Sequence, residues 1–447
     1  MRRVAFSFVL AAALALTGGP EAARAGEAPA GALSARVDAG ARAVEPRVLA
    51  WRRDLHAHPE LSNRETRTAA LVARELRRLG LEVRTGVAHT GVVGVLRGGR
   101  PGPVVALRAD MDALPVTEEL DLPFASKVRT TYDGREVGVM HACGHDAHTA
   151  ILLGAAEALA GVRESLPGQV VFLFQPAEEG APASEEGGAR LMLAEGAFRD
   201  PKPDAVFALH VVPQHAAGEI AVRSGGVMAS SDRLDVRVRG RQTHAAYPWL
   251  GVDPIAVASR IVLALQAIPG RQVDARHPSV VSIGVIRGGV RGNIIPEEVE
   301  LVGTIRTLEP AQQGRIHERV RATAAGVAES AGARAEVEIR IGYPVTLNDP
   351  ELTARMRPTL RRVAGAGNLV EGLPRTGAED FAYFAREAPG LYFWLGIRPP
   401  DVPEAEAAPN HSPRFFVDES ALGLGVRAMA ALALDFLASG GAAAPAR

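Results

Sequence analysis

Residues 170–180 read Val-Val-Phe-Leu-Phe-Gln-Pro-Ala-Glu-Glu-Gly. The first five are large and apolar, which is typical of a buried β-strand. Two adjacent carboxylates, Glu178 and Glu179, follow just beyond the end of this run. Two like charges side by side are costly without a cation, so one suits a metal ligand and the other a proton-transferring base. This stretch therefore predicts a buried strand with a functional site at its carboxyl end.

Similar apolar runs alternate with helical patterns on either side of this strand. Glu65–Leu79 repeats apolar residues at helical spacing and stops at Gly80, a residue typical of helix C-termini. Ala147–Leu159 is apolar and helical as well. Strands that alternate with helices predict an α/β fold, in which helices cover both faces of a sheet and sites gather at the carboxyl ends of strands. The other predicted strands are Val92–Leu96, Val104–Leu107 and Ala205–Leu209.

The pattern changes after residue 223 and returns at about Tyr343. In between, apolar and charged residues alternate, as in a half-exposed strand, and the expected order of elements is β-α-β-β-α. We therefore expect a large α/β domain, formed by residues 45–223 and 336–438, with a smaller α+β domain of residues 224–335 inserted into it. The elements expected in the insert are Leu234–Val238, Pro254–Ile268, Val280–Val285, Val299–Ile305 and Arg315–Ala331.

The N-terminus has the features of an export signal. Arg2 and Arg3 precede an apolar run, Val4–Leu16, and Ala23-Arg24-Ala25 offers the small-x-small pattern of a cleavage site. We expect residues 1–25 to be a signal peptide and the mature protein to be exported, either periplasmic or secreted. A loose, alanine-rich stretch is expected up to about residue 45. No later segment is expected to reach the roughly 20 apolar residues of a transmembrane helix.

The composition gives no support for a nucleic-acid or membrane partner and excludes an intramolecular disulfide. The formal net charge is −1, so nothing favours binding to nucleic acid or, after signal cleavage, to an anionic membrane. The length exceeds what one compact core usually holds, in agreement with two domains. Cys143 is the only cysteine, so no disulfide can form within one chain, and a lone thiol in an oxidising compartment needs a function.

Residues 141–148 read His-Ala-Cys-Gly-His-Asp-Ala-His, the densest group of metal-binding side chains in the sequence. Cys143 and His145 stand just before a predicted helix and can place a thiolate and an imidazole on one ion. Further candidates for the same site follow predicted strands or lie near the C-terminus: Asp110, Asp112, His210 and His411.

Four motifs, taken together, resemble a known family. Residues 107–115, 141–148, 174–180 and 378–381 are closely similar to the metal-dependent aminoacylase and amidohydrolase family, which includes hippurate hydrolase and the plant auxin-conjugate hydrolases. The resemblance covers roughly residues 45 to 435. It implies a zinc-exopeptidase-like catalytic domain with an inserted lid or dimerisation domain. It also implies two divalent metal ions and hydrolysis of the amide bond of N-acyl amino acids, or related conjugates, by a metal-activated water.

The resemblance also implies roles for individual residues. Glu178 would be the general base, which activates the water and later protonates the leaving amine. Asp112 would orient a metal ligand from behind. In the wider exopeptidase family a metal-binding His stands at the position of Asp110, so a ligand role for Asp110 stays open. The implied ligands are Cys143, as the bridging ligand, with His145, Glu179, His210 and His411.

Residues 240–248, Gly-Arg-Gln-Thr-His-Ala-Ala-Tyr-Pro, resemble the lid motif of the same family. His244 would polarise the substrate carbonyl or bind the developing oxyanion, and Asn293 would line the same pocket. Exposed strand edges in the insert favour a homodimer through residues 225–335. Whether His244 serves its own chain or the partner subunit stays open. Among the other histidines we expect His56 and His58 to be structural, and His89, His215, His277 and His317 to lie on the surface.

Two alternative functions remain. A carboxypeptidase or dipeptidase of the same fold would release an amino acid from a short peptide, which export would bring within reach. A non-catalytic metal- or peptide-binding protein is disfavoured by Glu178, because binding needs ligands but no base. Thiolate and imidazole favour zinc, whereas mixed carboxylate and imidazole sites also accept manganese, cobalt or nickel. The motifs do not indicate which acyl group or amino acid is preferred.

Overall fold

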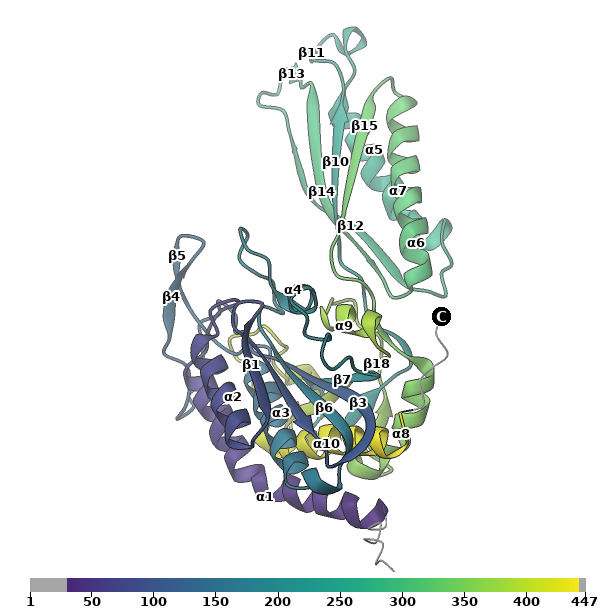
Figure 1. Ribbon diagram of the computed structural model, residues 1–447. Helices are drawn as coiled ribbons and strands as arrows, with labels where there is room; N and C mark the ends of the chain where they lie inside the picture. Colours follow the sequence, from purple (N-terminus) through teal and green to yellow (C-terminus); the bar gives the residue numbers. More distant parts are fainter. Residues whose placement is uncertain (1–29, 442–447) are drawn as a thin grey trace, which may run out of the picture.

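The protein has two bodies joined by a narrow connection (Figure 1). The structure, a computed structural model, describes residues 30–441. The predicted signal peptide, residues 1–25, lies outside the described residues. Residues before 225 and after 348 form the larger body, and most of the residues between them form the smaller one.

The larger body contains an eight-stranded mixed sheet. Its central strands run parallel to one another, whereas antiparallel pairs occur toward both edges. This sheet, covered by helices, confirms the predicted α/β class. In order across the sheet the strands are β1 (Glu82–Val87), β2 (Gly91–Arg97), β6 (Pro167–Gln175), β3 (Arg100–Asp110), β7 (Ala205–Ala216), β18 (Gly390–Arg398), β8 (Ile220–Val222) and β17 (Leu369–Glu371).

The apolar run 170–174 lies in β6 and is buried on both faces of the sheet. Phe172 and Phe174 pack into the core on one face, whereas Val171 and Leu173 pack into the core on the other. Successive side chains of a strand point to opposite faces, so an unbroken apolar run marks a strand covered twice. The first face is covered by α1 (Ala30–Ala57), α2 (Thr66–Arg78), α3 (His145–Ala160), α8 (Pro350–Ala364) and α10 (Leu422–Ala438), and the second by α4 (Gly188–Ala194) and α9 (Phe381–Glu387).

Two expectations about this body are wrong. The stretch before residue 45 is not loose, because α1 begins at Ala30 and buries Leu33 and Val37 in the core. A later segment is long and apolar enough to cross a membrane, namely Glu419–Ala438, which includes α10. However, 78% of its apolar stretch is buried inside the protein, as expected for a core helix. No other described helix, within residues 30–441, meets the same test.

The smaller body is an antiparallel four-stranded sheet with helices on one face. Leu234, Val236 and Val238 pack against those helices, while the intervening side chains face away from them. The strands are, in order, β12 (Ser279–Gly288), β14 (Glu298–Thr307), β10 (Asp232–Arg239) and β15 (Arg334–Ile341), and the helices are α5 (Pro254–Gln266), α6 (Ile268–Arg271) and α7 (Pro310–Glu329). At the far tip, β11 (Thr243–His244) pairs with β13 (Ile294–Ile295) (Figure 1).

The sequence pattern missed one strand of this sheet. β15 pairs with β10 along its whole length, and the expected order β-α-β-β-α lacks this last strand. The expected end of the inserted domain, residue 335, therefore falls inside β15. Its apolar residues Ala335, Val337 and Ile339 are only partly buried, because β15 is an edge strand, and they alternate with charged residues as in a half-exposed strand. His317 is also not on the surface as expected: it is buried on α7 and its Nε2 lies 2.8 Å from Asp232 Oδ2.

Short strands lie on the two sides of the connection. β9 (Gly225–Met228) leads into the smaller body and pairs with β16 (Thr346–Asn348), which leads out of it. Tyr343 lies in the returning segment, and its hydroxyl donates to the backbone oxygen of Glu178 at 3.0 Å. The connection therefore contacts one of the predicted site residues. A separate hairpin, β4 (Arg129–Tyr132) and β5 (Arg135–Gly138), extends from the larger body (Figure 1).

Candidate metal centre and active site

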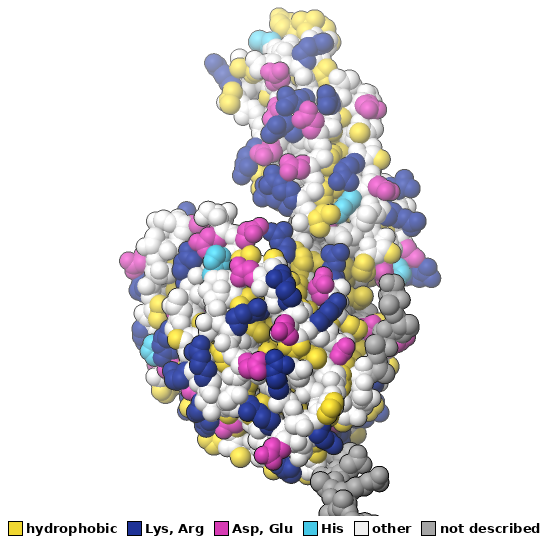
Figure 2. All heavy atoms as spheres, viewed as in Figure 1, with side chains coloured by type: hydrophobic (Ala, Val, Ile, Leu, Met, Phe, Trp, Pro, Cys, Tyr) yellow, Lys and Arg dark blue, Asp and Glu magenta, His cyan; other side chains and the backbone are white. Residues whose placement is uncertain are grey.

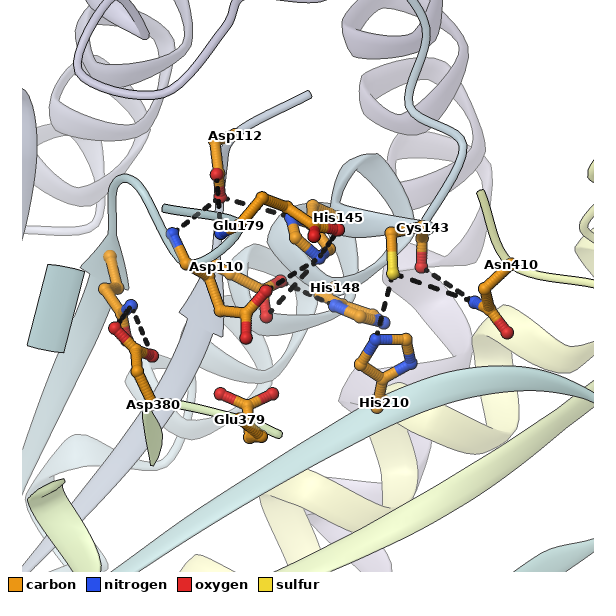
Figure 3. Close-up of polar contacts among 12 residues, drawn as sticks. Asp110, Asp112, Cys143, His145, His148, Glu179, His210, Glu379, Asp380 and Asn410 are labelled. Atoms are coloured by element: carbon orange, nitrogen blue, oxygen red, sulfur yellow. Dashed lines mark hydrogen bonds and ion pairs between the residues drawn. The ribbon is translucent and has the colours of Figure 1, made fainter. Parts of the chain in front are cut away.

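The predicted site residues of the larger body converge where its central strands end (Figure 3). Asp110 is the last residue of β3 and lies opposite Gln175, the last residue of β6. β7 does not end at Leu209 as predicted but continues to Ala216. His210 nevertheless lies at the same edge, because the pairing of β7 with β3 stops at Ala208.

A glycine turn fixes the positions of Cys143 and His145. Gly144 has a φ of 90°, and a Cβ built there would lie 2.2 Å from a methyl carbon of Val211. Glycine is therefore required both for the backbone conformation and for the space. α3 begins directly after this turn, at His145, and Cys143 Sγ lies 3.3 Å from His210 Nε2.

The five predicted metal ligands come together in two overlapping groups. One group consists of Cys143, His145 and His210, and the other of Cys143, Glu179 and His411; within each group the ligand atoms lie within 4.8 Å of one another. In the second group, His411 Nε2 is 3.1 Å from Glu179 Oε1. Cys143 belongs to both groups, which is the position that a bridging ligand requires.

The environment of His145 shows that these residues fit divalent metal ions. Its Nδ1 lies 3.2 Å from Asp112 Oδ1, while its buried Nε2 has no hydrogen-bond partner among the described residues. That Nε2 lies 3.9 Å from Glu179 Oε1 and 4.0 Å from Glu178 Oε2. These distances are too long for hydrogen bonds but suit an imidazole and carboxylates around one cation, with Asp112 orienting the ring from behind.

The pKa values of the cluster also indicate a need for cations. Burial, together with the charges of Glu179 and Glu178, holds the pKa of the Cys143 thiol well above its ordinary value. Burial lowers the pKa of His145, but the charge of Asp110 and the hydrogen bond to Asp112 outweigh it and raise the pKa to about 10. A thiol binds metal as a thiolate and histidine binds as the neutral ring, so divalent ions would replace the protons that this acidic site otherwise holds.

Asp112 contacts more of the site than its predicted role requires. Its Oδ1 accepts from the backbone N–H of Glu178 at 3.1 Å, and its Oδ2 accepts from the backbone N–H of Glu179 at 3.0 Å. Ser62 Oγ donates to the same Oδ2 at 2.7 Å. One buried carboxylate therefore fixes the backbone of both glutamates as well as the imidazole of His145.

A second acidic cluster lies beside Glu178. Glu379 and Asp380, which precede α9, share the buried guanidinium of Arg108, at 2.9 and 3.1 Å. Tyr392 Oη donates to the other oxygen of Glu379 at 2.8 Å. Burial and the charges of Glu379, Glu179 and Asp380 hold the pKa of Glu178 well above its ordinary value. The Glu178 carboxylate itself makes no hydrogen bond within residues 30–441, so it is free to exchange a proton with a ligand.

A cavity of about 560 Å³ opens onto this cluster. A second cavity, of about 510 Å³, lies on the other side of Glu179, between the chain at 180–183 and the β4–β5 hairpin. Glu179 therefore lines both cavities. The wall of the first cavity contains Cys143, Glu178, Glu179, His210 and His411 together with Met228, Tyr343, Arg375, Trp394 and Asn410.

His244 and Asn293 are not brought to this cavity. Both lie at the far tip of the smaller body (Figure 1), where His244 pairs with Ile294 and the backbone oxygen of Asn293 accepts from Ala245. The His244 side chain is exposed, and among residues 30–441 its Nδ1 accepts only from the backbone N–H of Ala246. The structure thus places these two residues beside each other, but their role at the active site stays a prediction.

Several contributors to the site were not singled out from the sequence. His148 Nδ1 donates to Asp110 Oδ1 at 2.6 Å, and its Nε2 accepts from the backbone N–H of Val211. Arg108 Nη1 donates to Asp110 Oδ2 at 2.7 Å, so both oxygens of Asp110 are engaged. Asn410 Nδ2 donates to the backbone oxygen of Cys143 at 3.3 Å. The available signals were the three histidines of residues 141–148 for His148 and the family motif of residues 107–115 for Arg108.

Fold and site together define a metal-dependent hydrolase with a dinuclear centre. The family model Peptidase family M20/M25/M40 matches residues 106–435, and the chain belongs to this family of metal-dependent amide hydrolases.

Individual relatives are similar over most of their length. The chain is 41% identical to thermostable carboxypeptidase 1 of Saccharolobus solfataricus, over 88% of this chain and 96% of the relative. It is 36% identical to an N-acetyl-L-cysteine deacetylase of Bacillus subtilis, over 85% of each protein. A crystal structure from Bacillus subtilis, described as a dinuclear metal-binding peptidase of family M20, aligns with a TM-score of 0.75 and 35% identity, covering 89% of this chain and 99% of that one.

Proposed function

We propose that this enzyme hydrolyses the amide bond of N-acyl amino acids, with Glu178 as the general base. The observation that carries this proposal is the free Glu178 carboxylate, which lines the cavity beside Glu179. Among the described residues its nearest ionic partner is His145 Nε2, at 4.0 Å. Metal binding alone would not require such a carboxylate, whereas hydrolysis requires a base within reach of a water.

The bound metal ions, Glu178 and His244 would have different roles in the reaction. When bound, the two ions would lower the pKa of water and polarise the scissile carbonyl. Glu178 would take a proton from the attacking water and return it to the departing amine. Its backbone is held by Asp112 and Tyr343, so the residue stays beside the metal ligands through both transfers. His244 would stabilise the developing oxyanion once the smaller body, or that of a partner subunit, approaches the cavity.

The relatives support amide substrates that end in an amino acid, and they support two variants of that function. An N-acetyl-L-cysteine deacetylase cleaves an N-acyl amino acid, which is the function we propose. The similarity to a carboxypeptidase, at 41% identity, favours as second candidate the release of a C-terminal amino acid from a short peptide. Both reactions use the same base and the same leaving group, an amino acid.

Assembly and location are further parts of the proposal. We propose a homodimer through residues 225–335, because large apolar side chains gather on the exposed surface of the smaller body (Figure 2). Val290 is 96% exposed, Trp249 71% and Leu250 60%. We also propose export, on the evidence of the apolar N-terminal segment and its cleavage pattern. Sequencing the N-terminus of exported, active protein should give a start at or near Gly26, and an intact Met1 would contradict export.

A substrate screen with defined metals tests the function. Metal-free protein receives zinc, manganese, cobalt or nickel and is then given N-acetyl and N-benzoyl amino acids and dipeptides. We expect free amino acid to be released from the N-acyl amino acids with at least one metal. Release from dipeptides alone would favour the peptidase, and release from no substrate with any metal would contradict both candidates.

A further inference from the structure

One cation lines the same cavity as the predicted metal ligands. Arg375 lies in the segment between β17 and α9 and is half-buried in the cavity wall. Its backbone is fixed on both sides: its N–H donates to Val227 at 2.9 Å, and its carbonyl accepts from Ala229 at 3.0 Å. The side chain is close enough to Cys143 for the two to interact electrostatically. Arg375 therefore faces the site where the amide is cleaved.

The guanidinium group is oriented but not neutralised. Its carbon lies 5.1 Å from the centre of the Trp394 ring, and Nη2 donates to Gln214 Oε1 at 3.1 Å. This is the only hydrogen bond of the guanidinium within residues 30–441, and no carboxylate in that part of the chain lies within ion-pair distance of it. Four of its five N–H donors are therefore unused by the described residues.

This arrangement differs from that of the two fully buried guanidinium groups near the site. Arg108 makes ion pairs with three carboxylates, and Arg52 contacts Asp146 and Glu419. Withdrawing a cation from water without a partner is costly. Burial accordingly lowers the pKa of Arg375, and the charge of Glu404, which lies beyond ion-pair distance, offsets this only in part. The planar guanidinium of Arg375 lies over an aromatic ring and forms no ion pair with a described carboxylate. Such a group suits bidentate binding of an incoming carboxylate.

We propose that Arg375 binds a carboxylate of the substrate while the amide lies over the metal centre, an inference that rests on the proposed function. The carboxylate has two possible sources. It is either the α-carboxylate of the amino acid that leaves, or a carboxylate at the far end of a dicarboxylic acyl group. In both cases Arg375 determines specificity and takes no part in proton transfer.

Three substrates separate the two sources. N-acetyl-leucine carries only the α-carboxylate, N-succinyl-leucinamide carries only an acyl carboxylate, and N-acetyl-leucinamide carries neither. We expect Arg375→Met to lower kcat/KM, mainly through KM, by about 10- to 100-fold for whichever carboxylate substrate the enzyme prefers. For N-acetyl-leucinamide, measured by acetate release, the change should stay within about 3-fold. Arg375→Lys, which keeps the charge but loses the fork, should give an intermediate loss.

A matched control and a binding measurement make the result unambiguous. Arg386→Met removes an exposed arginine from α9 that does not line the cavity, and it should behave as wild type on all three substrates. Calorimetric titration of N-acetyl-leucine and N-succinyl-leucinamide into metal-loaded Glu178→Gln protein, with and without Arg375→Met, gives the same comparison without turnover. Weaker binding of a carboxylate ligand alone supports the proposal. Equal losses for the uncharged amide, or no loss for either carboxylate ligand, would overturn it. A wild-type enzyme that cleaves no N-acyl substrate would instead contradict the proposed function.

Discussion

The edge of the large sheet and the tip of the smaller body both contain residues expected to act in catalysis, but they hold them differently. At the sheet edge, His145 and Asp112 are buried, and each contacts other residues of the site. At the tip, His244 is exposed, and the hydrogen bond of its side chain lies within its own loop. Converging strand ends thus form a site by folding alone, whereas the catalytic role proposed for His244 requires domain closure or a partner subunit.

The largest effect should follow from removing the ligand shared by the two metal groups. Cys143→Ala deletes the only atom common to both, so we expect loss of at least one metal ion and of most activity. Elemental analysis and turnover of the same preparation provide the measurement. Prolonged chelation of wild-type protein should abolish activity, and adding metal back should restore it. An active, fully metallated Cys143→Ala protein would show that the thiol is needed neither for metal binding nor for activity.

Removing Arg108 should lower the free energy of unfolding, because the residue lies in the same buried region. Arg108→Met leaves Asp110, Glu379 and Asp380 without their buried cation. Breaking a buried ion pair by deleting one partner costs about 3–5 kcal/mol, and we expect that loss in the free energy of unfolding by denaturant titration. Arg190→Met, which removes an exposed arginine of α4, is the control and should stay within about 0.5 kcal/mol of wild type. Equal stability of the two variants would contradict a structural role for the Arg108 cluster.

His244→Ala tests the tip of the smaller body. Loss of one oxyanion donor typically costs about 100- to 1000-fold in turnover, and we expect that loss with metal content and dimer intact. Mixing His244→Ala with Glu178→Gln protein distinguishes the two routes of delivery. Activity recovered in mixed dimers would show that His244 serves the partner, and no recovery despite proven subunit exchange would favour closure within one chain. Full activity of His244→Ala alone would show that the tip has no catalytic role.

The smallest effect should be confined to the fold of the smaller body. His317→Ala removes the 2.8 Å contact with buried Asp232. Gln313 still donates to both oxygens of Asp232 at 3.0 Å, so we expect only the loss of one hydrogen bond, about 0.5–1.5 kcal/mol. His277→Ala, at a half-exposed histidine of the same body, should cost less than about 0.5 kcal/mol. Metal content should not change in either variant. A loss of metals in His317→Ala would show that the two bodies are coupled more tightly than their narrow connection indicates.

The sequence predicted the fold and the site best at fully buried strands and at motifs in which metal-binding residues are concentrated. The apolar run 170–174 marked β6 because that strand is covered on both faces, and residues 141–148 marked the metal cluster because Cys and His are concentrated there. β15 was missed although its residues alternate as in a half-exposed strand, and α1 was missed because alanine obscures its apolar stripe. Arg108 lay within a family motif but its partners did not follow from it, and Arg375 gave no local signal, since both arginines contact residues far away in the chain, such as Glu379 and Trp394.

The adjacent carboxylates Glu178 and Glu179 test the central claim most directly, because we assign proton transfer to the first and metal binding to the second. Metal content and turnover should be measured together for Glu178→Gln and Glu179→Gln. We expect Glu178→Gln to keep both metals and to lose at least about 100-fold in turnover, and Glu179→Gln to lose metal. Loss of metal from Glu178→Gln, with full metal content in Glu179→Gln, would contradict this assignment and reverse the two roles.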